Sequence, residues 1–210
     1  MASLWSRLRG RRRLPARPRR TNVAVIGATG VGKSTLINAV VGSEQASAGI
    51  GAPVTKGLWF YETPDSRLGL YDFEGAESFT ELRRFVRNLT VIADERAAEG
   101  AEHAIHGYWL CLKASDRRFD DQQIELIQEL ATQRKPIWLV LTQTPWQPDR
   151  GFPDDVVEFL SHLTLLRLPI VGGRPFPVAA KDDEFAGTKQ YGINALRDSA
   201  QGYRPPPSRS

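Results

Sequence analysis

The stretch GATGVGKST (residues 27–35) follows a short apolar, β-branched run, NVAVI (residues 22–26). From Gly27 to Ser34 its spacing is Gly-x-x-x-x-Gly-Lys-Ser, the complete pattern of a phosphate-binding loop. Glycine lets the backbone curl so that amide N–H groups point inward, and a helix beginning here directs the positive end of its dipole at an anion. We therefore expect a buried strand, a phosphate-binding loop and a helix over residues 33–41.

This loop also predicts contacts with a nucleoside triphosphate and its metal ion. Lys33 is expected to reach the β- and γ-phosphates, and the Ser34 hydroxyl to bind Mg²⁺. The residues expected to line the bound nucleotide here are Gly27, Ala28, Thr29, Gly30, Val31, Gly32, Lys33, Ser34 and Thr35.

Beyond the loop, short apolar runs alternate with segments whose apolar residues recur every three or four positions. The runs predict strands at residues 22–27, 57–63, 67–73, 107–113, 136–143 and 174–180. The periodic segments predict helices at residues 78–98, 120–134, 153–167 and 194–200. This alternation implies an α/β, three-layer fold, with a mostly parallel sheet and helices on both faces. We expect one domain at residues 21–200, followed by a disordered tail at 201–210.

The first 20 residues have a different composition from the rest, with eight Arg and no acidic residue. The whole chain has 28 basic and 24 acidic residues, so the remainder has 20 basic against 24 acidic ones and is net acidic. The body is therefore not expected to bind nucleic acid by charge alone. We expect a disordered basic arm. The alternatives are contact with a membrane surface, binding to RNA or an acidic protein, and a mitochondrial transit peptide.

The overall composition, with 41% hydrophobic and 25% charged residues, is typical of a soluble globular protein. The single cysteine, Cys111, excludes an intrachain disulfide and fits a reducing compartment. No apolar run reaches the ~18 residues of a membrane span, and the start lacks the apolar segment of a secretory signal. We expect a cytoplasmic protein, with peripheral attachment to a membrane through the arm as the alternative.

Three later stretches, each next to a predicted strand, follow the phosphate-binding loop along the chain. APVTKGLWFY (residues 52–61) places Thr55 just ahead of a predicted strand, and LYDFEG (residues 70–75) ends a strand with Asp72-x-x-Gly75. PVAAKDD (residues 177–183) follows the last predicted strand. Over about residues 22–200, the chain resembles the Ras-like GTPases, and more narrowly the Era-like group with a 50S ribosome-binding type of G domain.

The resemblance implies GTP or GDP and Mg²⁺ as ligands. Thr55 and Asp72 would bind Mg²⁺ together with Ser34, and the Gly75 amide would meet the γ-phosphate. Lys33, Thr55 and Gly75 are the residues implied in catalysis. Ala180 and Lys181 stand where the family contacts guanine.

The base-reading motif departs from the family, which places [NT]-K-x-D after the strand at residues 136–143. Thr142 fits that motif, but Gln143 replaces Lys and Pro145 replaces Asp. We still expect Thr142 and Gln143 at the base. Asp149 could supply the missing carboxylate, and Trp146 either covers the base or packs as a loop aromatic. Adenine recognition stays open at this point.

Ala76 follows Gly75 where Ras-like proteins carry the Gln that orients the attacking water, so we expect slow hydrolysis that needs help. The expected function is a GTP-dependent switch acting with an unknown protein effector or activator. An ATP-binding or relaxed-specificity P-loop NTPase is one alternative, and a membrane-associated regulator docking through the arm is another. Arg117 and Arg118 are either surface charges or act across a nucleotide-dependent homodimer.

Overall fold

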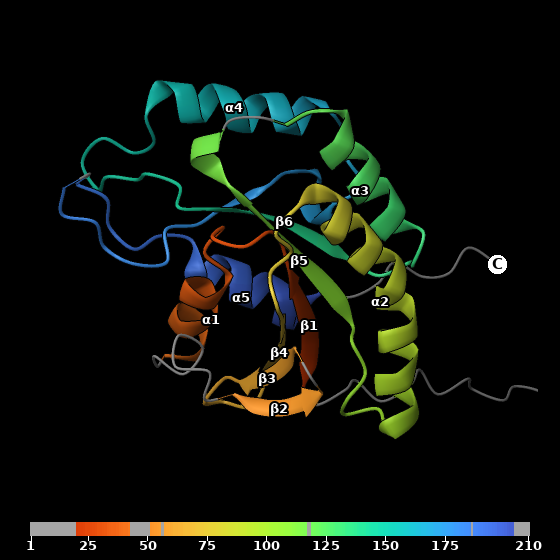
Figure 1. The fold of residues 1–210 in the computed structure, drawn as a ribbon. Coiled ribbons are helices and arrows are strands. Elements are labelled where there is room, and N and C mark those ends of the chain that lie inside the picture. The colour runs from red at the N-terminus through yellow and green to blue at the C-terminus, as the bar shows by residue number, and fades with distance from the viewer. Residues whose placement is uncertain (1–19, 43–50, 56, 117–118, 186, 204–210) are drawn as a thin grey trace, which may run out of the picture.

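The protein folds as a seven-stranded sheet covered by helices on both faces (Figure 1). The computed structural model describes residues 20–42, 51–55, 57–116, 119–185 and 187–203, with backbone alone for Thr55. The expectations for residues 1–19, for Arg117 and Arg118 and for residues 204–210 lie outside this set. No helix in the described ranges is long and apolar enough to cross a bilayer.

The sheet is mostly parallel, as predicted. Its strands follow the order β2-β3-β4-β1-β5-β6-β7, and only β3 runs antiparallel to its two neighbours. The strands are β1 (Thr21–Ile26), β2 (Ala52–Thr55), β3 (Leu58–Glu62), β4 (Leu68–Phe73), β5 (Gly107–Lys113), β6 (Ile137–Thr142) and β7 (Phe176–Pro177). The carboxyl ends of the central parallel strands therefore meet at one edge, where α/β sheets bind ligands.

Five α-helices pack on the sheet. They are α1 (Lys33–Val41), α2 (Phe79–Glu99), α3 (Asp121–Ala131), α4 (Asp154–Leu165) and α5 (Ile193–Gly202), with short 3-10 turns at Ala114–Asp116 and Val171–Gly173. Figure 1 shows α1 and α5 on one face and α2 and α3 on the other. Alternate residues of β1 enter the two cores: Ala24 and Ile26 pack toward α2, α3 and α4, whereas Val23 and Val25 pack toward α1 and α5. Burial on both faces explains why β1 is apolar at each position from Val23 to Ile26.

Capping residues set where α2 and α3 begin. The Ser78 hydroxyl accepts a hydrogen bond from the Glu81 backbone N–H at 3.2 Å. Asp120 caps α3 in a capping box with Gln123. The Asp120 side chain accepts a backbone N–H of the first helical turn, and the Gln123 side chain accepts the backbone N–H of Asp120. Such caps satisfy amide groups that the first helical turn leaves unpaired.

The expected elements differ from the observed ones at both edges of the sheet. Thr55 precedes β3, as expected, but it also ends an edge strand that was not predicted, β2, where it pairs with Leu58. The last strand, expected at residues 174–180, is only Phe176–Pro177. Pro175 and Pro177 have no backbone N–H to donate, which restricts pairing at this edge.

The folded unit extends slightly beyond the expected boundaries. Arg20, placed in the arm by composition, donates to Glu62 at 2.6 Å and to the Glu102 carbonyl at 2.7 Å. At the other end α5 runs to Gly202, and the Tyr203 ring meets Trp138 edge-on at 5.4 Å between centroids. The tail expectation for residues 201–203 is therefore replaced by helix and packed aromatic.

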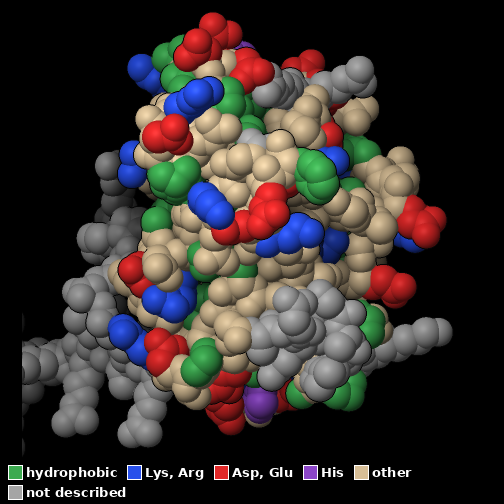
Figure 2. Space-filling view, turned by 90° about the vertical axis from the view of Figure 1, so that its left-hand side faces the viewer, with side chains coloured by type: hydrophobic (Ala, Val, Ile, Leu, Met, Phe, Trp, Pro, Cys, Tyr) green, Lys and Arg blue, Asp and Glu red, His purple; other side chains and the backbone are tan. Residues whose placement is uncertain are grey.

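Charges on the surface of the body are mixed. Figure 2 shows Lys and Arg side chains interspersed with Asp and Glu over one face of the molecule. That face carries no broad patch of a single sign, which agrees with the acidic net charge of the chain beyond the arm.

Candidate nucleotide-binding site

The phosphate-binding loop joins β1 to α1 at the ligand-binding edge of the sheet. Gly32, at φ +94° directly before α1, occupies the left-handed region that favours glycine. At Gly27 a Cβ atom would lie 2.6 Å from the Cys111 carbonyl oxygen. Neighbouring strand β5 therefore leaves no room for a side chain there, and both motif glycines have a structural reason.

Lys33 lies inside the loop rather than reaching into solvent. Its side chain is buried, and its Nζ donates to the carbonyls of Gly27 and Ala28, each at 2.9 Å. Burial lowers the pKa of Lys33, because a charged amine loses hydration there. An ammonium group held this way forms the floor of an anion site.

Asp72 provides the opposite charge. It is the next-to-last residue of β4, lies beside Val25 of β1 and is 7% exposed. Burial raises its pKa to about 6, with Lys33 acting in the other direction. Among the described residues its Oδ1 atom is buried without a hydrogen-bond partner. A buried, unsatisfied carboxylate oxygen is costly, and a hard cation is the ligand that satisfies it.

Asp72 and Ser34 share a cavity of about 250 Å³ with Lys33, Glu74 and Gly75. A hydroxyl, a carboxylate and a phosphate-binding loop on one cavity match the oxygen ligands that Mg²⁺ prefers. The donor set therefore fits this ion. Glu74 was missed by the sequence analysis, because an exposed carboxylate inside the Asp-x-x-Gly stretch carries no signal of its own.

The pH dependence of stability provides a test of the burial of Asp72. Its folded pKa of about 6 exceeds the unfolded value of 3.8, so its ionisation destabilises the fold. In the presence of a chelator and without nucleotide, the protonated Asp72 therefore contributes to the free energy of unfolding. This contribution is fully present below pH ~4 and is lost as the pH rises to ~6, which lowers the free energy of unfolding by up to about 3 kcal/mol.

Urea unfolding of the natural chain and of Asp72→Asn, from pH 4 to 7, measures this contribution. The variant should gain stability relative to the natural chain over this pH window. A difference between the two proteins that does not change with pH would contradict the burial of an ionisable carboxyl at this position.

The segment after β4 is fastened to the phosphate-binding loop. The Thr29 N–H donates to the Ala76 carbonyl at 2.8 Å, and the Thr29 hydroxyl to the Gly75 carbonyl at 3.0 Å. A Cβ on Gly75 would lie 2.8 Å from Lys33 Nζ and 2.9 Å from Thr29 Cα. Glycine is thus required by the close approach of the two motifs, a contact that the sequence did not predict.

A larger cavity, of about 610 Å³, extends from the loop toward the end of β6 and the segment after β7. We call it the base-side cavity. It is lined by Gly30, Gly32, Lys33, Ser34, Thr35, Ala114, Ser115, Thr142, Gln143, Pro145, Ala179, Ala180, Lys181, Asp183 and Thr188. Part of the phosphate-loop residues expected from sequence and the residues expected at the base thus line one cavity; Gly27, Ala28, Thr29 and Val31 do not line it. Asp183 and Thr188 were missed, although the acidic pair after Lys181 was a visible signal.

Thr142 and Gln143 connect β6 to the phosphate-binding loop. The buried Thr142 hydroxyl can donate to the carbonyl of Val31 or of Leu112. Gln143 Nε2 donates to the Gly30 carbonyl at 3.4 Å. The Gln that replaces the family's Lys therefore lies over the loop.

Several expected residues lie elsewhere. Ala28 and Val31 line a separate cavity with α2 and α3, so their side chains do not face the base-side cavity. Thr55 lies in edge strand β2, and its side chain is outside the described set. The Asp149 side chain is 78% exposed and does not line the base-side cavity. Trp146 stacks on Tyr191 at 4.7 Å, which matches the packed-aromatic interpretation.

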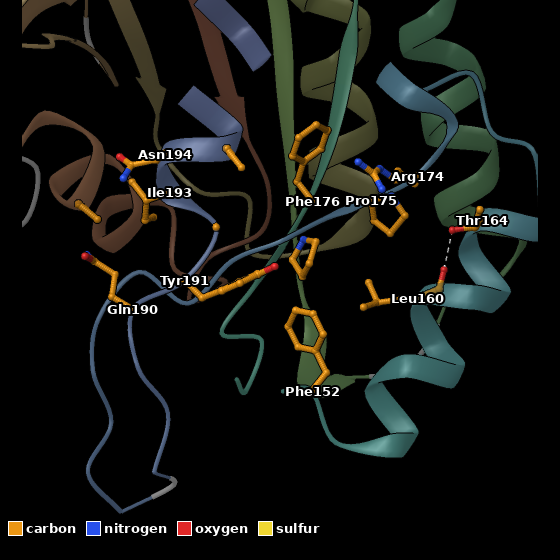
Figure 3. A pocket seen from close by; sticks show the side chains of 14 residues that line it. Phe152, Leu160, Thr164, Arg174, Pro175, Phe176, Gln190, Tyr191, Ile193 and Asn194 are labelled. Atoms are coloured by element: carbon orange, nitrogen blue, oxygen red, sulfur yellow. Dashed lines mark hydrogen bonds between the residues drawn. The ribbon is translucent and has the colours of Figure 1, made fainter. Parts of the chain in front are cut away.

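A second large cavity, of about 590 Å³, lies away from the phosphate-binding loop, at the β7 edge (Figure 3). Phe152, Leu160, Phe176 and Tyr191 supply its apolar surface, and Arg174 lies at its margin. Tyr191, one of its lining residues, stacks on Trp146.

Comparison with known proteins gives a family match and several related folds. The family described as 50S ribosome-binding GTPase matches residues 22–143. No curated protein matches the chain in sequence. A probable GTP-binding protein EngB is similar in structure, with a TM-score of 0.58 and 18% identity over 88% of this chain and 100% of that chain.

Two longer proteins share the fold over part of their length. Era, crystallised with MgGDPNP and nucleotides of 16S ribosomal RNA, has a TM-score of 0.55 and 17% identity, covering 91% of this chain and 59% of Era. Elongation factor SelB from Methanococcus maripaludis has a TM-score of 0.51 and 12% identity, covering 87% of this chain and 33% of SelB. At these identities the structures show a common fold.

Proposed function

Because the chain belongs to the family of 50S ribosome-binding GTPases, we propose that it is a slow, GTP-dependent molecular switch. Membership carries GTP binding and hydrolysis as the general activity. The observation that supports a switch is the fastening of Gly75 and Ala76 to Thr29 in the phosphate-binding loop. Triphosphate bound at that loop would compete with these contacts and so change the segment that leads into α2.

In this proposal each residue acts on the phosphates or on the metal ion. Lys33 exchanges its two carbonyl partners for the β- and γ-phosphates, and the Gly75 amide meets the γ-phosphate. Ser34, Asp72 and Thr55 would hold Mg²⁺, which would neutralise charge on the phosphates. Amides of the loop, from Gly27 to Thr35, and the dipole of α1 surround the remaining oxygens.

Slow turnover follows from what lies next to Gly75. Ala76 has a methyl group, which cannot orient a water molecule, and its carbonyl is engaged with the Thr29 N–H. Efficient hydrolysis then needs a group from an effector or activator protein, or from a second copy of this chain.

Era was crystallised with 16S ribosomal RNA, and by analogy the arm of residues 1–20 is proposed to contact RNA, with a membrane surface as the alternative.

Titrations with fluorescent mant-GTP and mant-ATP, in Mg²⁺, test this proposal together with a single-turnover hydrolysis assay. We expect GTP to bind at least about tenfold more tightly than ATP, and an intrinsic rate on the order of 10⁻³ s⁻¹. Equal or tighter binding of ATP would favour a relaxed-specificity or ATP-binding protein, as Pro145 suggests. Turnover above about 1 s⁻¹ by the isolated chain would contradict the slow switch.

A further inference from the structure

A carboxylate reaches the base-side cavity from an unexpected part of the chain. A hairpin, described at residues 182–185 and 187–190, leads into Tyr191 (Figure 3). Asp183 and Thr188 pair with each other across it. Both residues line the cavity of about 610 Å³ that begins at Lys33 and Ser34. Asp183 is the only acidic residue among those that line it. The cavity is therefore lined by the cations Lys33, at its phosphate end, and Lys181, and by the carboxylate of Asp183.

We propose that Asp183 reads the guanine base, in the role that Pro145 cannot perform. The inference rests on the proposed function, because it assigns the base contact of the same nucleotide site. Guanine presents two adjacent donors, N1–H and the 2-amino group, which one carboxylate accepts side by side. Adenine presents an acceptor at N1, so the same carboxylate would face a lone pair and reject it.

Aromatic packing holds the hairpin at the cavity. Tyr191, at its base, stacks on Trp146 with centroids 4.7 Å apart and meets Phe152 edge-on at 5.2 Å. The Lys189 N–H donates to the Trp146 carbonyl at 3.1 Å. The loop that would normally carry the base-reading Asp thus carries the anchor of the hairpin instead.

Polar contacts make the hairpin rigid. The backbones of Asp183 and Thr188 exchange two hydrogen bonds of 2.9 Å. Asp182 accepts from Lys189 Nζ and from the Gln190 N–H, each at 2.8 Å. A carboxylate carried on a preorganised segment loses little entropy on binding, which favours specific recognition.

The orientation of Asp183 is also set locally. Its Oδ1 atom accepts the Phe185 N–H at 3.1 Å. An ionised carboxylate has about four acceptor positions, so this bond is compatible with further acceptance from a base. Asp182, by contrast, does not line the cavity.

The family match supports neither this assignment nor a competing one, because it ends at Gln143. Both Asp149 and Asp183 are exposed, but Asp149, the other candidate from sequence, lies outside the cavity lining. Gln143 carries an amide, which both donates and accepts and so discriminates weakly between the bases. Among the described residues that line the cavity, Asp183 is left as the group whose charge suits the two donors of guanine.

The test is a set of titrations with the mant derivatives of GTP, ITP, XTP and ATP, on the natural chain, Asp183→Asn and Asp149→Asn. Asn at position 183 keeps an oxygen for the Phe185 N–H, so the hairpin should fold, and thermal melting checks this. ITP lacks the 2-amino group. XTP carries a carbonyl in its place, which an Asn amide can contact as a donor while accepting N1–H.

We expect the natural chain to prefer GTP to both ITP and XTP. Asp183→Asn should bind GTP about ten- to hundredfold more weakly and XTP more tightly, whereas Asp149→Asn should match the natural chain. If the natural chain binds GTP and XTP equally, or if Asp183→Asn keeps its GTP preference, Asp183 does not read the base. Failure of the natural chain to bind any triphosphate would instead refute the proposed function.

Discussion

Lys33→Ala will bind GTP about a hundredfold to a thousandfold more weakly than the natural chain. The buried ammonium of Lys33 is the only cation that lines the Asp72 cavity among the described residues. Its transfer from two backbone carbonyls to two phosphate oxygens supplies charge-assisted hydrogen bonds worth about 1.5–3 kcal/mol each. Two such bonds amount to about 3–6 kcal/mol, and the two carbonyl bonds given up on binding offset part of this, which leaves the stated change in Kd.

Isothermal titration with GTP and Mg²⁺ measures the change, and Lys135→Ala serves as the control. Lys135 lies between α3 and β6 and lines neither of the two nucleotide-site cavities. The Lys135→Ala substitution removes the same charge from the chain as Lys33→Ala, so an effect of net charge on GTP affinity would appear in both variants. A GTP affinity of Lys33→Ala within about threefold of the natural chain would show that the loop does not use this lysine.

Asp72→Asn will have two effects of opposite sign. Without nucleotide it should melt at a higher temperature near pH 7, because burial of the ionised carboxyl destabilises the natural chain. With GTP, raising Mg²⁺ from zero to millimolar levels should strengthen binding to the natural chain at least about tenfold and leave the variant nearly unchanged. A structural role alone would not produce the loss of Mg²⁺ dependence.

Melting curves and GTP titrations at several Mg²⁺ concentrations provide both readouts. Asp94→Asn, on the exposed side of α2, removes a carboxylate that lines neither cavity and should behave as the natural chain does. If Asp72→Asn retained the full Mg²⁺ effect, the orphaned Oδ1 atom would not be a metal ligand, directly or through water.

Most of the central fold could be predicted from the sequence because its signals are local. Apolar continuity identified β1, and glycine spacing identified the loop and the start of α1 at Lys33. The signals weaken at the edges of the sheet. The strand ending at Thr55 and the shortness of β7 depend on pairing with β3 and β6, which no local pattern encodes.

The base-binding end could be predicted only in part. Thr142, Gln143, Ala180 and Lys181 line one cavity, since they lie at or beyond the ends of the neighbouring strands β6 and β7. That they contact the base stays a prediction. Asp149 was the nearer carboxylate in sequence to the missing position. It lies outside the cavity lining because the loop that contains it uses Trp146 to hold Tyr191.

The sequence by itself determined that a strand, a phosphate-binding loop and a helix follow one another from Thr21 to Val41, because glycine conformation, helix dipole and apolar burial act over a few residues. Only the tertiary structure decided that Thr29 holds Gly75 and that Asp183 reaches the base-side cavity. Thr29 and Gly75 lie far apart along the chain, and Asp183 lies in a hairpin that aromatic stacking positions. Their contacts arise when the sheet and its loops assemble, since through-space chemistry depends on distances that sequence spacing does not specify.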